Sequence, residues 1–235
     1  AFFDYDADGD LDLYLVDGST YEHYGQGPGN VLYRNEGSGA FSIAVVGAED
    51  RGWGIGAAVG DVDGDGYDDL YVTNYGANAF YRNKGDGTFV DIEAGASGDD
   101  YSASAAFFDY DADGDLDLYV ANYVVFDIAP VLADPELDDP CIYLGGLRVF
   151  CGPQGMAGGR DRLYRNDGNS TFADITQSSG IATANFNYGL GVVSDDFDGD
   201  GDLDIFVAND ETTNALFRND AGDPDGDGDI DLFVS

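Results

Sequence analysis

Short apolar runs separated by dense polar turns recur along the chain, and they predict β-strands. Each of the clearest runs spans six residues, is rich in Leu, Tyr, Val and Phe, and follows an acidic turn. Runs of this length and composition are typical of strands rather than helices. The runs are LDLYLV, DDLYVT, LDLYVA, LDIFVA and IDLFVS, and they begin at residues 11, 68, 116, 203 and 230.

Three further segments recur around these runs, so that one unit comprises about four strands. An Arg-Asn segment ends in Asn-x-Gly or a close variant, which indicates a hairpin turn. The Arg-Asn segments are Leu32–Gly37, Phe80–Gly85, Leu163–Gly168 and Leu216–Gly222. A segment centred on Phe follows at Gly39–Ile43, Gly87–Ile92 and Ser170–Ile175. A segment rich in small residues precedes the acidic turn, beginning at Gly52, Tyr101 and Tyr188.

The size of the unit predicts a propeller. The acidic turns begin at residues 4, 61, 109, 196 and 223, and four strands in roughly 45 residues make one propeller blade. We therefore expect an all-β chain, a single β-propeller domain over residues 1–235, with about four units and a remnant of a fifth. Small residues in the glycine-rich strands would let neighbouring backbones approach closely.

Two spacings are irregular. The third and fourth turns are 87 residues apart, which predicts an insertion at about residues 123–160. The fourth and fifth are only 27 apart, because the Phe segment and the glycine-rich strand are missing near residues 219–223. We expect open sheet edges, and either a fragment of a longer propeller or a chain that a neighbour completes.

Each acidic turn has the pattern Asp-x-Asp-x-Asp-Gly-x-x-Asp, which predicts a calcium site. Alternate carboxylates on a tightly turning backbone can face one centre, hard cations prefer such oxygens, and glycine at position 6 permits the turn. The variable position 7 suits a backbone carbonyl ligand. The predicted ligands, positions 1, 3, 5, 7 and 9 of each loop, are Asp4, Asp6, Asp8, Asp10 and Asp12; Asp61, Asp63, Asp65, Tyr67 and Asp69; Asp109, Asp111, Asp113, Asp115 and Asp117; Asp196, Asp198, Asp200, Asp202 and Asp204; and Asp223, Asp225, Asp227, Asp229 and Asp231.

The loops are not EF-hands. An EF-hand needs a bidentate Glu at position 12 and a following helix, whereas position 12 here is Leu or Val and a strand follows. The sequence predicts about one Ca²⁺ per loop, up to five. Two carboxylates about 4 Å apart repel by roughly 4 kcal/mol at an effective dielectric constant near 20. We therefore expect that the protein needs calcium for stability.

The charge of the chain excludes some partners. Forty-seven acidic and nine basic residues give a formal net charge of −38, so nucleic acid and anionic membrane surfaces are not expected to bind by charge. Twenty of the 47 acids occupy the four Asp positions of the five loops, and metal binding explains that share better than solubility does. No run of about 20 apolar residues occurs, so no membrane insertion is expected.

The insertion combines an acidic, proline-rich stretch with two cysteines. A three-residue turn at Gly145–Leu147 would place Cys141 opposite Cys151 in a hairpin, where a disulfide is possible. The alternative is two buried free thiols. The acids Asp134, Glu136, Asp138 and Asp139 occur outside the repeats. They form either a solvated loop or a site for a partner or an extra cation.

The acidic loop and its following strand resemble the FG-GAP or VCBS repeats of integrin-α-type propellers, and Gly54–Ala57 resembles the glycine-rich half of that motif. LYRNDG, TFADIT, DFDGDGDLDIFVAND and CIYLGGLRVFCGP are closer still to the cartilage acidic protein 1 and ASPIC/UnbV family. The resemblance implies a seven-bladed, calcium-stabilised propeller that is secreted or surface-exposed. It also implies that Asp side chains at positions 1, 3, 5 and 9, with the position-7 carbonyl, hold the ion.

The sequence favours a binding protein over an enzyme. The single histidine, His23, lies in a glycine-rich loop, and no nucleophile, zinc-protease or phosphate-loop motif occurs. The first hypothesis is a secreted calcium-binding propeller that acts as a binding or adhesion module for an extracellular protein or polysaccharide. The second is a structural subunit that assembles with copies of itself. The third is a polysaccharide hydrolase or lyase that uses a non-repeated acid such as Glu136.

Overall fold

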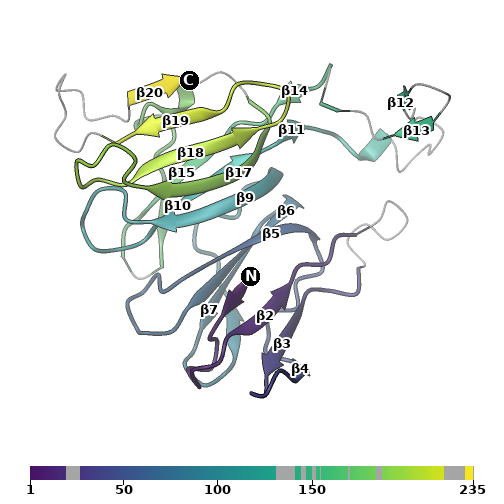
Figure 1. Cartoon of the computed structure of the whole chain (residues 1–235), viewed down its shortest axis with the longest axis vertical. Coiled ribbons are helices and arrows are strands. Elements are labelled where there is room, and N and C mark those ends of the chain that lie inside the picture. Colours follow the sequence, from purple (N-terminus) through teal and green to yellow (C-terminus); the bar gives the residue numbers. More distant parts are fainter. Residues whose placement is uncertain are drawn as a thin grey trace.

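In the described residues, the computed structural model contains four four-stranded antiparallel units, one for each predicted unit (Figure 1), and the second and third are joined into one eight-stranded sheet. Each unit is called a sheet below. It describes residues 1–19, 27–130, 141–143, 147–149, 152–153, 155–168, 170–183, 187–219 and 231–234. The sheets follow one another in sequence order from the N-terminal sheet to the C-terminal sheet. The chain is therefore all-β in the described residues, apart from short turns, as the alternation of apolar runs and turns predicts.

Each sheet has the strand order of the chain. The first consists of β1 (Phe2–Phe3), β2 (Asp12–Leu15), β3 (Val31–Asn35) and β4 (Phe41–Ala44). The second consists of β5 (Trp53–Gly60), β6 (Asp69–Gly76), β7 (Ala79–Asn83) and β8 (Phe89–Asp91). The third consists of β9 (Asp100–Phe108), β10 (Asp117–Asn122), β15 (Arg162–Asn166) and β16 (Phe172–Asp174). The fourth consists of β17 (Gly189–Asp195), β18 (Asp204–Asn209), β19 (Ala215–Arg218) and β20 (Asp231–Val234).

Two connections complete the architecture. The second and third sheets are joined at one end, where β6 pairs with β9 through Tyr75 and Tyr101. A 3₁₀ turn, η3 (Ile181–Thr183), lies between β16 and β17. Within the described residues, no strand pairing joins the first sheet to the fourth.

The strand after the fifth acidic turn corrects the predicted remnant of a fifth unit. This strand, β20, pairs with β19 and becomes the outer strand of the fourth sheet. The fourth unit has no Phe segment, so the outer edge of β19 would otherwise present unpaired backbone groups. The fourth sheet is thus complete, and no separate fifth unit forms in the described part of the chain.

The segment between β10 and β15 forms two small pairs of strands. In one, β11 (Val124–Val125) pairs with β14 (Ala157–Gly158); in the other, β12 (Cys141–Tyr143) pairs with β13 (Leu147–Val149). The β12–β13 hairpin stands away from the four sheets (Figure 1). Its register places Cys141 opposite Val149 and Tyr143 opposite Leu147. The predicted register, with Cys141 opposite Cys151, is therefore wrong by two residues, because the strands are connected between Tyr143 and Leu147, one residue earlier than the predicted turn at Gly145–Leu147. Cys151 lies outside the described residues, and the disulfide stays a prediction.

The apolar core lies between consecutive sheets. One cluster joins Tyr14 and Leu32 of the first sheet to Leu70 and Tyr81 of the second, and two equivalent clusters join the second sheet to the third and the third to the fourth. Each inner sheet therefore buries both faces, which explains why every residue of β10 and the first six residues of β6 are buried. Glycine permits this approach: a Cβ atom added to Gly56 would lie 3.0 Å from the backbone oxygen of Ala103.

The outer faces of the first and fourth sheets keep apolar side chains exposed. In and beside β4, the exposed fractions are 46% for Phe41, 66% for Ile43 and 84% for Val45. In and after β17, they are 55% for Val193 and 47% for Phe197. In the described residues, no helix is long and apolar enough to cross a membrane.

Candidate metal centres

Four acidic loops share one backbone geometry. In the first loop, the N–H groups of Asp8 and Gly9 donate to the two carboxylate oxygens of Asp4, at 3.0 and 2.9 Å. The same pair of bonds forms to position 1 of the other three loops, at 2.9–3.2 Å. The carboxylate at position 1 thus closes each turn from within. Such short-range bonds between Asp and backbone are typical of tight Asp-rich turns.

Positions 4 and 6 of every described loop have positive φ. Position 6 is always glycine, whereas position 4 is Ala7 and Ala112 in the first and third loops (φ of 58° and 57°) and Gly64 and Gly199 in the others. Left-handed backbone is costly for residues with a Cβ atom. The glycine at position 6 was predictable from the motif. At position 4 the available signal was the restriction to Ala and Gly, the two smallest residues.

The carboxylate at position 9 is the buried end of each loop. Asp12, Asp69, Asp117 and Asp204 are at most 1% exposed. Asp117 accepts from the N–H of Tyr110, at 2.7 Å, and from the N–H of Asn166, at 2.8 Å. Equivalent pairs of bonds hold the other three at 2.7–3.1 Å. Position 9 therefore ties the loop to the Arg-Asn strand of its own sheet.

Carboxylate oxygens from three positions converge within 4.8 Å of one another in each described loop. Positions 1, 3 and 9 form the triads Asp61–Asp63–Asp69, Asp109–Asp111–Asp117 and Asp196–Asp198–Asp204, whereas positions 1, 3 and 5 form the triad Asp4–Asp6–Asp8. All donors are oxygens, the set that suits Ca²⁺. The structure therefore brings together three of the predicted side chains in each loop. The ligand roles of the remaining position-5 and position-9 carboxylates and of the position-7 carbonyl stay predictions.

Position 7 also supports the loop through its N–H group. The N–H groups of Asp10, Tyr67, Asp115 and Asp202 donate to the carboxylate at position 5 of their own loops, at 2.9–3.0 Å. This bond fixes position 5 and explains how a Tyr can replace Asp at position 7, since only the backbone of that residue takes part.

The carboxylate at position 3 has an unsatisfied oxygen that a bound cation could contact. One buried oxygen of Asp6 and one of Asp63 have no hydrogen-bond donor. Burial, followed by the neighbouring carboxylate at position 5, raises the pKa of Asp63 and of Asp111. Burial also raises the pKa of Asp69 to about 7 and that of Asp117 to about 6. A divalent cation among these oxygens would contact the unpaired oxygens and lower the raised pKa values, so the residues fit calcium.

The arginine of the Arg-Asn strand lies against the acidic loop of its own unit. Arg34 pairs with Asp6 and Asp8, both at 2.9 Å. Arg82 lies 3.9 Å from Asp63, and Arg218 lies 3.7 Å from Asp198. Arg165 instead pairs with Asp167, at 2.7 Å. The guanidinium groups of Arg34, Arg82 and Arg218 thus offset part of the charge of their loops.

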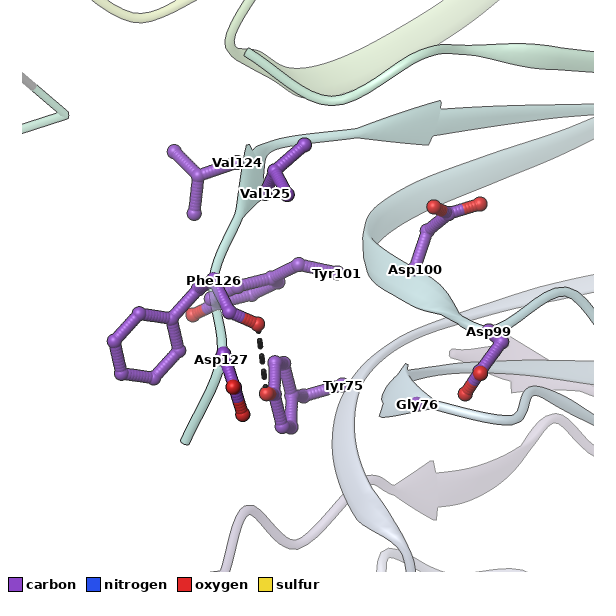
Figure 2. Close-up of a pocket in the computed structure, with 9 residues that line it drawn as sticks. All are labelled: Tyr75, Gly76, Asp99, Asp100, Tyr101, Val124, Val125, Phe126 and Asp127. Atoms are coloured by element: carbon purple, nitrogen blue, oxygen red, sulfur yellow. Dashed lines mark hydrogen bonds between the residues drawn. The ribbon is translucent and has the colours of Figure 1, made fainter. Parts of the chain in front are cut away.

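A pocket of about 270 Å³ lies where the second and third sheets join. Figure 2 shows the rings of Tyr75, Tyr101 and Phe126 near Asp99 and Asp127. The Tyr75 hydroxyl donates to the carbonyl of Phe126, at 2.8 Å, and accepts from the N–H of Ile128, at 3.0 Å. It therefore fixes the start of the insertion over the pocket. No local sequence pattern predicts this pocket, because its walls come from two units and from the insertion.

Several predicted residues lie outside the part of the chain whose side chains the structure describes. They are the fifth loop (Asp223, Asp225, Asp227, Asp229 and Asp231), Cys141 and Cys151, His23, and the non-repeated acids Asp134, Glu136, Asp138 and Asp139. The backbone of Cys141 and Asp231 is described within β12 and β20. The predictions for the side chains of all these residues are unchanged.

Comparison with known proteins agrees with the repeated geometry. The family model for the FG-GAP-like repeat matches residues 4–72, 61–120 and 149–207. No curated protein matches the chain. Among solved structures, an Agrocybe aegerita lectin, described for recognition of non-reducing terminal N-acetylglucosamine, matches with a TM-score of 0.36 and 19% identity. That match covers 99% of this chain and 64% of the lectin chain. Because the three family matches include most of the sequence and each contains acidic loops of the same design, the chain belongs to the FG-GAP-like repeat family.

Proposed function

We propose that this chain is part of a secreted, non-enzymatic β-propeller that acts as a binding or adhesion module and is stabilised by calcium. The observation that carries the proposal is the convergence of three carboxylates in each of four loops with the same backbone bonds. Ligands that repeat with the fold serve the fold. Catalytic groups, by contrast, belong to one place in a molecule, whereas every triad of converging carboxylates among the described residues belongs to a repeated loop.

Calcium is proposed as a resident part of the structure, about one ion per loop and up to five in all. Asp side chains at positions 1, 3, 5 and 9 and the carbonyl at position 7 would hold it. Extracellular calcium modules often bind with dissociation constants of roughly 10⁻⁴ to 10⁻³ M. At the millimolar calcium outside cells such sites would be largely filled, which supports the proposed secreted location.

The propeller itself is part of the proposal. Three consecutive interfaces use the same faces and the same kind of cluster, so further units could continue the series to a closed ring. We favour a closed ring of blades, as the motif resemblance to the cartilage acidic protein 1 and ASPIC/UnbV family implies.

The pocket at the junction of the second and third sheets is the proposed contact point for a partner. Its tyrosine and phenylalanine rings suit the apolar face of a sugar or a side chain, and Asp99 and Asp127 can accept hydrogen bonds from it. An extracellular protein or polysaccharide is the proposed partner. Substituting Asp99 and Asp127 by Asn would reduce its binding and leave calcium binding unchanged.

A structural subunit is the second candidate, and the exposed end faces favour it. Ile43 and Val45 at one end and Val193 and Phe197 at the other are each between 47% and 84% exposed, and contact with another chain would bury this apolar surface. A second copy could cover both faces in a head-to-tail assembly.

Light scattering and thermal unfolding with millimolar Ca²⁺, and then with excess chelator, test the proposal. Filling two sites at 100 times their dissociation constant would add about 5 kcal/mol, or about 10–20 °C in Tm for a chain of this size. A monomer that is compact in calcium and unfolds earlier in chelator supports the binding module. A large assembly that dissociates in chelator supports the structural subunit, and equal Tm values in both buffers would contradict the calcium role.

A further inference from the structure

In the second, third and fourth sheets, the asparagine of the Arg-Asn strand connects two acidic loops that belong to different sheets. The side-chain amide of Asn166 donates to the carbonyl of Val62, at 2.9 Å. Val62 is position 2 of the preceding loop, 104 residues earlier in the chain. Asn83 makes the equivalent bond to the carbonyl of Tyr5, at 2.9 Å, and Asn219 to that of Tyr110, at 2.7 Å. The link is therefore present at all three interfaces between sheets.

Each link has a position-9 carboxylate at both ends. The N–H of Asn166 donates to Asp117 of its own loop, at 2.8 Å. On the other side, the N–H of Val62 donates to Asp69 of the preceding loop, at 3.1 Å. The buried members of two candidate calcium triads are thus joined through one asparagine and one loop residue. Repeated along the molecule, these bonds form a continuous path from Asp12 to Asp204.

We infer that Asn83, Asn166 and Asn219 are positioning residues that couple calcium binding in consecutive loops. The inference rests on the proposed calcium role. An ion that draws the position-9 carboxylate toward its triad fixes residue 2 of that loop, and this holds the carbonyl where the next asparagine needs it. The same asparagine then orients the next position-9 carboxylate. Occupancy of one loop therefore favours the bound arrangement of its neighbour, and the effect must be reciprocal.

The first unit provides a matched control. Asn35 donates its N–H to Asp12 and its side-chain amide to the carbonyl of Leu11, at 2.7 and 3.0 Å. Among the described residues it makes no bond to another sheet, since the first sheet has no predecessor there. Asn35→Asp therefore changes the same local bonds and adds the same charge as Asn166→Asp, without removing a link between sheets.

Site-resolved hydrogen exchange during a calcium titration tests the coupling. In the unaltered protein, we expect the second and third loops to become protected at the same calcium concentration. Asn166→Asp should separate the two midpoints by about five-fold or more, and Asn35→Asp should leave them together. Coincident midpoints in Asn166→Asp, or equal separation in Asn35→Asp, would overturn the inference. If no loop gains protection with calcium, the proposed function fails instead.

A second variant removes the need to alter the asparagine. Asp63→Ala disables the second loop but leaves the bonds of Asn166 in place. It should raise the calcium midpoint of the third loop by about five-fold, and Asp63→Ala combined with Asn166→Asp should show no further rise beyond Asn166→Asp alone. An unchanged third loop in Asp63→Ala contradicts coupling even if Asn166→Asp does not fold.

Discussion

The first and third acidic loops have the same sequence and different environments. Phe2–Tyr14 and Phe107–Tyr119 are identical over thirteen residues, FFDYDADGDLDLY. The third loop brings positions 1, 3 and 9 together, whereas the first brings positions 1, 3 and 5 together. The local sequence therefore sets the turn itself, and the choice of converging carboxylates comes from elsewhere.

Two features of the surroundings account for the difference: the pairing of the nearby arginine and the position of the loop among the sheets. Arg34 pairs with Asp6 and Asp8 of the first loop, but the equivalent Arg165 is paired with Asp167, where the first unit has Glu36. In addition, the third loop lies between two sheets, while the first lies at the end of the series, where Leu11 is 57% exposed. Identical binding motifs thus acquire different charge balance from residues outside the motif.

The largest expected difference between the loops comes from truncating position 9. In chelator, Asp12→Ala and Asp117→Ala should each lower the free energy of unfolding by about 2–4 kcal/mol, since each leaves two backbone N–H groups without an acceptor. In calcium, Asp117→Ala should lose more, because Asp117 belongs to its triad and Asp12 does not. Urea unfolding in the two buffers measures both effects. Equal losses in calcium would show that the two loops bind the ion alike.

The pH dependence without calcium sharpens the same comparison. Burial raises the folded-state pKa of Asp69 to about 7 and of Asp117 to about 6, above the unfolded value near 3.9. The folded state therefore binds protons more tightly between these values, and stability in chelator should fall as pH rises from about 4 to 7. Calcium should abolish this fall. Carboxyl NMR titration of Asp12 and Asp117 would show whether the identical loops titrate together.

Of the first and third loops, only the first should respond to substitution of its arginine. Arg34→Gln frees Asp6 and Asp8 and should tighten calcium binding there by several-fold, since a competing cation is removed. Arg165→Gln should leave the third loop nearly unchanged. Because the side chain of Arg34 is 41% exposed, solvent screens its ion pairs and its loss should change the stability in chelator very little. Calcium titration by calorimetry would distinguish the two variants, and a shared increase would refute the competition.

The smallest effect should be the same in both loops. Ala7→Gly and Ala112→Gly relieve left-handed backbone at φ of 58° and 57°. Each should stabilise the protein by about 0.5–1 kcal/mol after the entropy cost of glycine, whereas Gly64→Ala should destabilise it. Thermal unfolding suffices as the measurement. Unequal gains would mean that the surroundings strain even the shared backbone.

Much of this arrangement could be predicted from repeated residues. The runs after the acidic turns, the Arg-Asn strands and the glycine-rich strands all form where their patterns indicate, because each segment carries its own turn and strand signals. The asparagines were recognised only as part of a turn. Their invariance in all four Arg-Asn segments was a signal, but the carbonyl that accepts from Asn166 lies 104 residues away. No local pattern records such a distance.

Two predictions failed because pairing is decided between segments rather than within them. The register of Cys141 depends on where the β12–β13 strands begin to pair. The strand after the fifth loop carries the pattern of a second strand, yet it occupies the outer place beside β19. In both cases, the sequence identified the strand and left its partner open.

The placement of β20 has a consequence for how such chains evolve. An outermost strand is held by backbone bonds to a single neighbour, and those bonds make few demands on side chains. A deletion between two repeats can therefore remove an outer strand without leaving the sheet one strand short, because the next strand along the chain pairs at the same edge. Repeat number in this family could drift through unequal recombination, with selection acting on the inner strands and tolerating exchange at the rim.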